Sequence, residues 1–201
     1  MPELCKIDPK KYKTALDFSY NFYRYKLRKG SKIPYFTYLS SVSNLIIENN
    51  GSTDEAIAGL LHDAYEFNTQ RSFLNKISYK FGVRVSNIIK QCSNAGCLKL
   101  NEKDWINQKK KFLENMNKKS QASLFVSLCD KIHAVSCMIS DHSRIGKKLW
   151  TQFVANPEEM IWYYKSLCRN FKKFLKNHKN LKDRFQRNVN ELEYLVKKNQ
   201  H

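Results

Sequence analysis

The residues best suited to chemistry lie in the segment AIAGLLHDAYEF, residues 56–67. His62 and Asp63 stand side by side at the end of an apolar run, and Glu66 follows three residues after Asp63. Histidine supplies a nitrogen and aspartate an oxygen, a mixture of ligands that suits manganese, iron or zinc. Adjacent residues on a helix diverge by about 100°. His62 and Asp63 can therefore share a metal only if further ligands close the cage.

A second segment, LFVSLCDKIHAV at residues 124–135, supplies another acid. Asp130 lies in an apolar context, where a carboxylate costs free energy unless it is paired or binds a metal. Glu66 is spaced to face the same pocket as His62 and Asp63, where it could act as a general acid or base. The alternative is that His62 is a hydrogen-bonded core histidine and that Asp130 pairs with a lysine or arginine.

Apolar residues at helical spacing predict that helices position both segments. Scarce Gly (6) and Pro (4) residues and short β-branched runs argue against a sandwich or barrel. Helices are predicted over 35–48, near 72–81, around 85–92, along 125–139 and over 181–198. Another is predicted from Asp8–Pro9 to the break at 28–34. Three more are predicted to begin at the capping box Ser52–Glu55, after Trp105 and at Asn156–Pro157. Residues 93–104 are the best candidate for a loop. We therefore predict an all-α fold.

The chain has 201 residues, 42% of them hydrophobic, which is enough for one large domain with its own core. We predict one helical domain over residues 1–178. The segment 179–201 keeps apolar residues at helical spacing within a surface rich in Lys, Arg and Asn. It is predicted to form a basic C-terminal helical extension.

The formal net charge of +18 makes contact with a polyanion plausible, but a solvated Lys-rich surface explains it equally well. No nucleic-acid-binding motif accompanies the charge, so nucleic acid is a less favoured partner. The six cysteines form no CxxC pair, which indicates a reducing compartment. Since no apolar signal segment or membrane span is evident, a cytoplasmic location is expected.

Two stretches resemble the HD-domain phosphohydrolases. They are RKGSKIPYFTYLSSVSNLIIENNGSTDEAIAGLLHDAYE, residues 28–66, and FVSLCDKIHAV, residues 125–135. The closest resemblance is to the RelA/SpoT-type hydrolases of guanosine tetraphosphate, (p)ppGpp, and to their small single-domain relatives. It extends over about residues 10 to 175, because GKKLWTQF and IWYYKSLCRNF resemble a small bacterial HD group.

The resemblance implies an all-helical HD bundle holding a divalent metal, usually manganese, that activates water to attack a phosphate ester. It assigns the metal ligands to His62, Asp63 and Asp130. Glu66, with Asp63, is expected in the catalytic role of positioning or activating the water.

The same resemblance implies that the substrate is a phosphorylated nucleotide such as (p)ppGpp or another phosphorylated small molecule. The basic loop that contacts its phosphates falls on Arg28 and Lys29. Tyr35 is expected in the wall of the same pocket.

Three positions depart from the family pattern. The first histidine ligand falls on Tyr38, an acidic residue falls on Phe67, and an asparagine falls on Ala134. Tyrosine is a poor ligand for a divalent metal unless it is ionised, and its reference pKa is about 10. No histidine precedes His62 that could replace the lost ligand.

Three functions follow from these residues. The first is a metal-dependent phosphohydrolase with an impaired metal site. The second is an inactive HD protein that binds a nucleotide or a partner protein. The third is a helical nucleic-acid-binding protein that uses the basic C-terminal segment.

Overall fold

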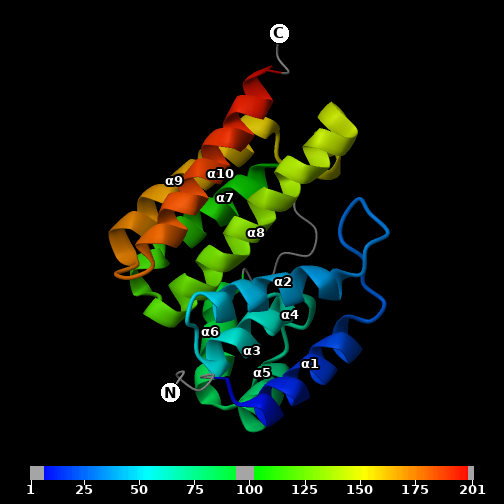
Figure 1. The fold of residues 1–201 in the computed structure, drawn as a ribbon, viewed down its shortest axis with the longest axis vertical. Coiled ribbons are helices and arrows are strands. Elements are labelled where there is room, and N and C mark those ends of the chain that lie inside the picture. Colours follow the sequence, from blue (N-terminus) through cyan, green and yellow to red (C-terminus); the bar gives the residue numbers. More distant parts are fainter. Residues whose placement is uncertain (1–6, 94–101, 199–201) are drawn as a thin grey trace, which may run out of the picture.

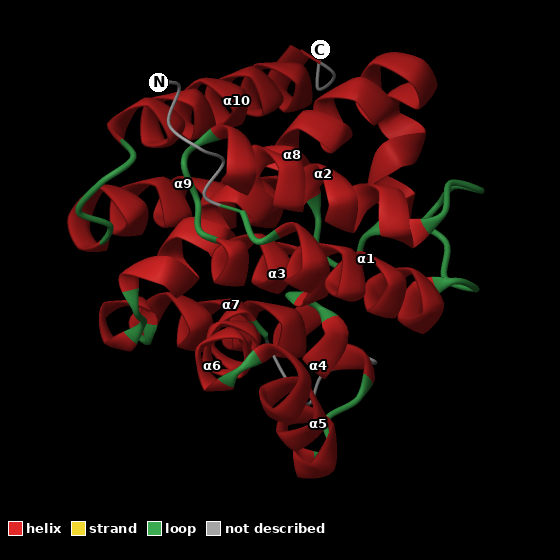
Figure 2. Cartoon of the chain, turned by 60° about the horizontal axis from the view of Figure 1, so that its bottom comes forward, coloured by secondary structure: helices red, strands yellow, loops and turns green. Residues whose placement is uncertain are grey.

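The computed structural model describes residues 7–93 and 102–198, and within them every regular element is helical (Figures 1 and 2). The predicted all-α fold is confirmed. In chain order the elements are α1 (Pro9–Tyr23), α2 (Tyr35–Glu48), α3 (Thr53–Leu61), α4 (Ala64–Phe67), α5 (Arg71–Phe81), α6 (Val83–Cys92), α7 (Glu102–Glu114), η1 (Met116–Lys118), α8 (Gln121–Ile145), η2 (Gly146–Gln152), α9 (Pro157–Phe174) and α10 (Lys179–Lys198), η1 and η2 being short 3-10 helices.

The predicted helix starts are confirmed by their capping hydrogen bonds. The Asp8 side chain accepts from the backbone N–H groups of Lys10 and Lys11. Ser52 and Glu55 form a reciprocal capping box at the start of α3. Asn156 and Glu159 form another at the start of α9. Each cap satisfies N–H groups that have no partner inside the helix.

Two predicted boundaries differ from the structure. The first helix ends at Tyr23, and the chain then turns so that Leu27 forms an isolated antiparallel bridge with Pro34. The predicted loop at 93–104 is shorter at its C-terminal end, because α7 begins at Glu102. Residues 94–101 of that loop lie outside the described part of the chain.

Helix α8 forms the axis of the bundle. It packs against α2, α3 and α6 on one side and against α9 and α10 on another (Figure 1). Its predicted apolar stripe is confirmed, since Phe125, Leu128, Ile132 and Val135 are all buried, although Ile139 is half-buried. A side chain on the inner face of α8 therefore meets groups from both halves of the molecule.

The central helix is also apolar and long enough, over Gln121–Gln152, to pass a length-and-composition test for a membrane span. The expectation that no stretch passes such a test is wrong. However, 61% of its most apolar window is buried inside the bundle. Core packing explains the apolar character of this segment. Passing the test is therefore only weak support for a membrane span.

The last helix, α10, packs along α8 and α9. It buries one side chain on nearly every turn, namely Leu181, Phe185, Val189, Leu192 and Val196. These residues join the same hydrophobic core as the rest of the bundle. The segment is thus helical as predicted, while its treatment as a separate unit after residue 178 stays a prediction.

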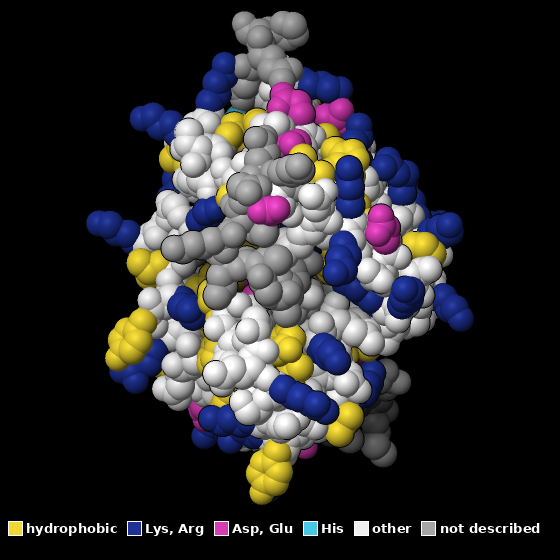
Figure 3. Space-filling model, turned by 180° about the vertical axis from the view of Figure 1, so that it is seen from behind, with side chains coloured by type: hydrophobic (Ala, Val, Ile, Leu, Met, Phe, Trp, Pro, Cys, Tyr) yellow, Lys and Arg dark blue, Asp and Glu magenta, His cyan; other side chains and the backbone are white. Residues whose placement is uncertain are grey.

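The basic residues are spread over the surface. Figure 3 shows Lys and Arg side chains scattered across one whole face of the molecule, with few acidic groups between them. The pattern favours a solvated basic surface over a dedicated nucleic-acid groove on this face.

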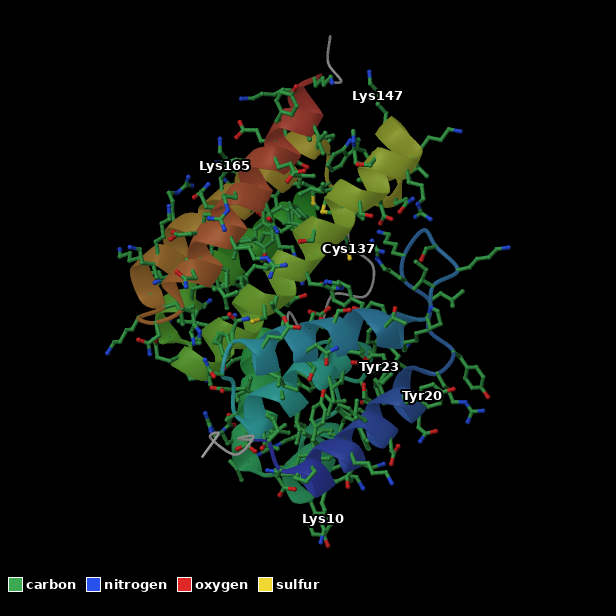
Figure 4. The ribbon with its side chains drawn as sticks, viewed as in Figure 1. Lys10, Tyr20, Tyr23, Cys137, Lys147 and Lys165 are labelled. Atoms are coloured by element: carbon green, nitrogen blue, oxygen red, sulfur yellow. The ribbon has the colours of Figure 1, made fainter. Side chains whose placement is uncertain are left out.

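The four cysteines in the described part of the chain differ in burial. Cys129 and Cys168 are buried thiols, whereas Cys137 on α8 is only half-buried (Figure 4). Cys92 is also half-buried, and all four of these described cysteines are free.

Substituting Phe185 tests whether α10 is part of the cooperative core. Phe185→Ala is expected to lower the free energy of unfolding by about 3–5 kcal/mol, because it removes a fully buried ring and leaves a cavity. Tyr194→Ala, on the same helix but 62% exposed, should change it by no more than about 0.5 kcal/mol. Urea unfolding followed by circular dichroism measures both. Equal small effects would show that α10 unfolds independently of the bundle.

Candidate metal centre

The His62–Asp63 pair lies at a junction between two helices. Helix α3 ends at Leu61, His62 is its C-cap residue, and Asp63 is the N-cap residue of the short helix α4. The sequence had suggested one continuous helix through Glu66. The break lets the two adjacent side chains approach one pocket, which the angular separation along an unbroken helix would oppose.

The His62 imidazole is buried, with 2% of its surface exposed. Its Nδ1 is 2.8 Å from the carbonyl oxygen of Gly59, and its Nε2 faces two carboxylates. Nε2 lies 3.2 Å from Asp63 Oδ2 and 3.3 Å from Asp130 Oδ1. Neither approach has hydrogen-bond geometry, so Nε2 is a buried polar atom without a hydrogen-bond partner. The three side chains therefore lie together in the structure, while their role as metal ligands stays a prediction.

Asp130 reaches this centre from α8 and is compensated on both carboxylate oxygens. The Tyr38 hydroxyl of α2 donates a hydrogen bond to Oδ1. The Lys131 ammonium lies 2.6 Å from Oδ2. On the other carboxylate of the centre, the Tyr35 hydroxyl donates to Asp63 Oδ2. Two tyrosine hydroxyls and one ammonium thus satisfy the two buried acids.

Burial and charge act in opposite directions on the acids. Burial raises the pKa of Asp130, but the Lys131 ammonium and His62 outweigh it and hold the pKa well below its usual range. The pKa of Asp63 is also lowered, because His62 outweighs the effect of burial. Both carboxyl groups are therefore ionised at neutral pH.

The pKa values of the two cationic groups, His62 and Lys131, are shifted in the opposite direction. Burial lowers the pKa of His62, but Asp63 and Asp130 outweigh it and raise the pKa well above its usual value. The pKa of Lys131 is likewise raised, since Asp130 outweighs burial. The neighbouring carboxylates thus favour the positively charged forms of His62 and Lys131.

The two tyrosines stay neutral. Burial, followed by the nearby carboxylate of Asp63 or Asp130, raises the pKa of Tyr35 and of Tyr38 well above 10. Their rings stack with centroids 5.7 Å apart and planes 6° from parallel. At the position of the missing histidine, Tyr38 is therefore a hydroxyl donor and offers no anionic ligand.

The residues as arranged do not fit a divalent metal. Among the side chains in residues 7–93 and 102–198, no group of three or more His, Cys, Asp and Glu is placed to hold a metal ion. Metal ligation also requires a deprotonated imidazole, whereas the two carboxylates favour protonated His62. Tyr38 already engages the oxygen of Asp130 that faces His62.

A lysine that sequence reasoning missed lies near the centre. Lys109 of α7 places its Nζ 5.5 Å from the ring centroid of Trp105 and 5.2 Å from that of Tyr163. Burial, together with the neighbouring Lys131 charge, lowers its pKa to about 8, and Glu66 acts in the opposite direction. The sequence signal was a lysine four residues after Trp105, within one turn of the same helix face.

The three predicted phosphate-binding residues are placed differently from one another. Tyr35 reaches the centre through Asp63. Arg28 pairs with Asp141 of α8, so its charge is already engaged. Lys29 has an exposed side chain whose Nζ lies 5.7 Å from the ring centroid of Phe153.

Phe67, at a position where the family has an acid, forms an aromatic wall. It is 39% exposed and packs edge-on against Tyr35 and Tyr23, with the Lys26 Nζ 4.0 Å above its ring. In Figure 4, Tyr23 is labelled near the C-terminal end of α1, where its side chain is fully buried. The loss of the acid therefore leaves a cation and an aromatic face beside Asp63.

Two further histidines lie on α8. His133 packs against Tyr38 with ring centroids 4.8 Å apart, and its Nε2 lies 3.5 Å from Cys137 Sγ. This agrees with a structural role. His142 is 8% exposed and packs near Trp150, so it is a core residue. Ala134 is half-buried and offers no polar group.

Two solved structures resemble this fold. One is described as a metazoan orthologue of SpoT that hydrolyses ppGpp and plays a role in starvation responses. It matches with a TM-score of 0.71 and 17% identity, over 92% of this chain and 96% of that one. The other is lmo0812 from Listeria monocytogenes EGD-e. It matches with a TM-score of 0.61 and 19% identity, over 76% of this chain and 96% of that one. At these identities the likeness shows the fold.

The family assignment comes from the sequence itself. No curated protein matched the chain. The model of the HD domain matches residues 15–161, which include His62, Asp63 and Asp130. Divalent metal binding is typical of HD domains. The chain belongs to the HD-domain family.

Proposed function

We propose that this HD protein binds a phosphorylated nucleotide beside the His62–Asp63–Asp130 centre, at the exposed side of Phe67, without efficient metal-dependent hydrolysis. The observation that carries the proposal is the hydrogen bond from the Tyr38 hydroxyl to Asp130 Oδ1. It places a neutral donor where the family has a histidine ligand. It also engages the carboxylate oxygen that lies 3.3 Å from His62.

The charges of the centre support the same proposal. Asp63 and Asp130 contribute two negative charges, and protonated His62 and Lys131 contribute two positive charges. The buried network is therefore neutral without a metal. A divalent cation that displaced the His62 proton would leave one uncompensated positive charge in a largely buried site, at a cost in free energy.

The surroundings of the centre favour a phosphorylated aromatic ligand. Lys26 lies above the Phe67 ring, and Lys109 adds a second cation from α7. Lys29, on the same 24–34 loop as Lys26, is a more distant cation that lies near Phe153. The exposed face of Phe67 can stack with a base. The fold is shared with a protein described as hydrolysing ppGpp, so a guanosine polyphosphate is the first ligand to test.

The second candidate function is metal-dependent hydrolysis of the same ligand class. It is favoured by the buried His62 Nε2, which lies within 3.3 Å of one oxygen of each acid and lacks a hydrogen-bond partner. Three protein ligands with an open position can support catalysis by a metal such as manganese. The cytoplasmic location expected from the sequence is part of either proposal.

Calorimetry with guanosine tetraphosphate tests binding. The chain is expected to bind it and to release no pyrophosphate in the presence of Mn²⁺. Lys29→Gln should weaken binding by about tenfold, the loss of one charge-assisted contact to phosphate. Lys32→Gln, an exposed lysine on the same loop, is the matched control and should bind like the parent. Turnover by the parent chain would replace this proposal with the second candidate.

Restoring the family's first histidine tests the role of Tyr38. Tyr38→His should raise Mn²⁺ affinity at least tenfold, because it adds a nitrogen ligand and removes the hydroxyl from Asp130. Elemental analysis of metal content per chain measures this. Tyr38→Phe removes the hydroxyl without adding a ligand, so its Mn²⁺ affinity should rise much less. If the parent chain already holds one manganese per chain, Tyr38 does not close the site.

The ionised acids predict how stability depends on pH. Because the folded pKa of Asp130 lies below its unfolded value, its contribution is complete above about pH 4 and is lost as the pH falls through the folded pKa. Urea unfolding between pH 7 and pH 3 should show only the beginning of this loss, because the folded pKa of Asp130 lies below that range. Asp130→Asn should flatten that part of the curve, while Asp17→Asn, an exposed acid, should leave it unchanged. An unchanged acid dependence in Asp130→Asn would contradict the assigned charges.

A further inference from the structure

A cavity of about 620 Å³ opens beside α4, α6 and α7. Neither it nor two other cavities in the described chain, of about 630 and 510 Å³, is lined by His62, Asp63 or Asp130. Its size falls within the range of small-molecule sites. It therefore offers a separate place for a ligand.

The lining of this cavity combines cations, amides and aromatic rings. Lys90, Lys111 and Lys119 supply the positive charges, and no Asp or Glu is among the lining residues. Tyr65 and Phe112 supply aromatic surface. The amide and hydroxyl groups come from Gln91, Ser93, Asn107, Gln108 and Asn115.

The three lysines lack acidic counterparts. No ion pair found within residues 7–93 and 102–198 engages Lys90, Lys111 or Lys119. The Lys119 Nζ instead lies 3.3 Å from the ring centroid of Phe112, and burial lowers its pKa to about 8. A bound anion would offset both the mutual repulsion of these cations and the cost of burying Lys119.

The other two kinds of lining group fit a nucleobase. Aromatic side chains offer stacking surfaces that accept any base. Carboxamides present both donors and acceptors, as the edge of a base requires. Phosphate, aromatic base and polar edge occur together in a nucleoside phosphate.

The cavity is also joined to the candidate metal centre. Ser93, one of its lining residues, donates a hydrogen bond of 3.0 Å to the backbone carbonyl of His62. Tyr65 follows Asp63 by two residues, in the short helix α4. A ligand in the cavity would contact Ser93, which bonds to His62, and Tyr65, which follows Asp63 in the chain.

We propose that this cavity is a second binding site, specific for a nucleoside di- or triphosphate, in which Lys111 and Lys119 hold the phosphates and Tyr65 contacts the base. It is independent of the nucleotide binding proposed at His62–Asp63–Asp130, because it uses a different set of residues.

Calorimetric titration of the full chain with GDP and with ATP tests the site. The double variant Lys111→Gln/Lys119→Gln should lose at least tenfold in affinity. The matched control Lys110→Gln/Lys118→Gln removes the same charge from exposed neighbours that do not line the cavity, and it should bind like the parent. Guanosine and inorganic phosphate, titrated separately, should each bind far more weakly than GDP.

The two nucleotide proposals are separated by Lys29→Gln, which should leave binding at the cavity unchanged. Single Lys111→Gln, at an exposed position, provides a second variant if the double variant is unstable. Equal losses in the matched control would reduce the effect to net charge and overturn the proposal. Failure of the parent chain to bind either nucleotide, or full binding by the double variant, would also overturn it.

Discussion

The buried carboxylate of Asp130 is the constraint on which the centre of this molecule depends. It lies on the axial helix α8, where an ionised acid must be compensated. Tyr38 from α2, His62 from the end of α3 and Lys131 from α8 itself supply that compensation. The interaction therefore links three elements that the chain separates widely. It also explains why acid, imidazole and ammonium groups titrate as a set, each holding its neighbour charged.

Replacing a histidine by Tyr38 changes more than the number of ligands. A neutral imidazole leaves a metal free to bind the acids, whereas a tyrosine hydroxyl donates a hydrogen bond to Asp130. The raised pKa of Tyr38 keeps that proton in place. Together with protonated His62, this makes a network that is neutral and nearly complete by itself. In this chain the His–Asp–Asp framework of the HD fold is paired internally, through Tyr38, Tyr35 and Lys131.

The centre and the cavity differ in charge. Two acidic groups, Asp63 and Asp130, lie in the centre, whereas Lys90, Lys111 and Lys119 line the cavity beside α4, α6 and α7. This arrangement suits ligands that carry phosphates, since the lysines attract them and the acids stay shielded. The high net charge of +18 is spread over the surface and is not confined to one binding site. The scattered lysines of Figure 3 agree with it.

The sequence by itself determined the helices, their caps and the candidate residues His62, Asp63 and Asp130. Such features follow from local spacing and side-chain type, as the boxes at Ser52–Glu55 and Asn156–Glu159 show. The tertiary structure decided what those residues contact. The break after Leu61, the donor role of Tyr38 and the approach of Lys109 arise from packing between distant segments. Charge balance in a buried site depends on distances across helices, and no spacing along the chain encodes those distances.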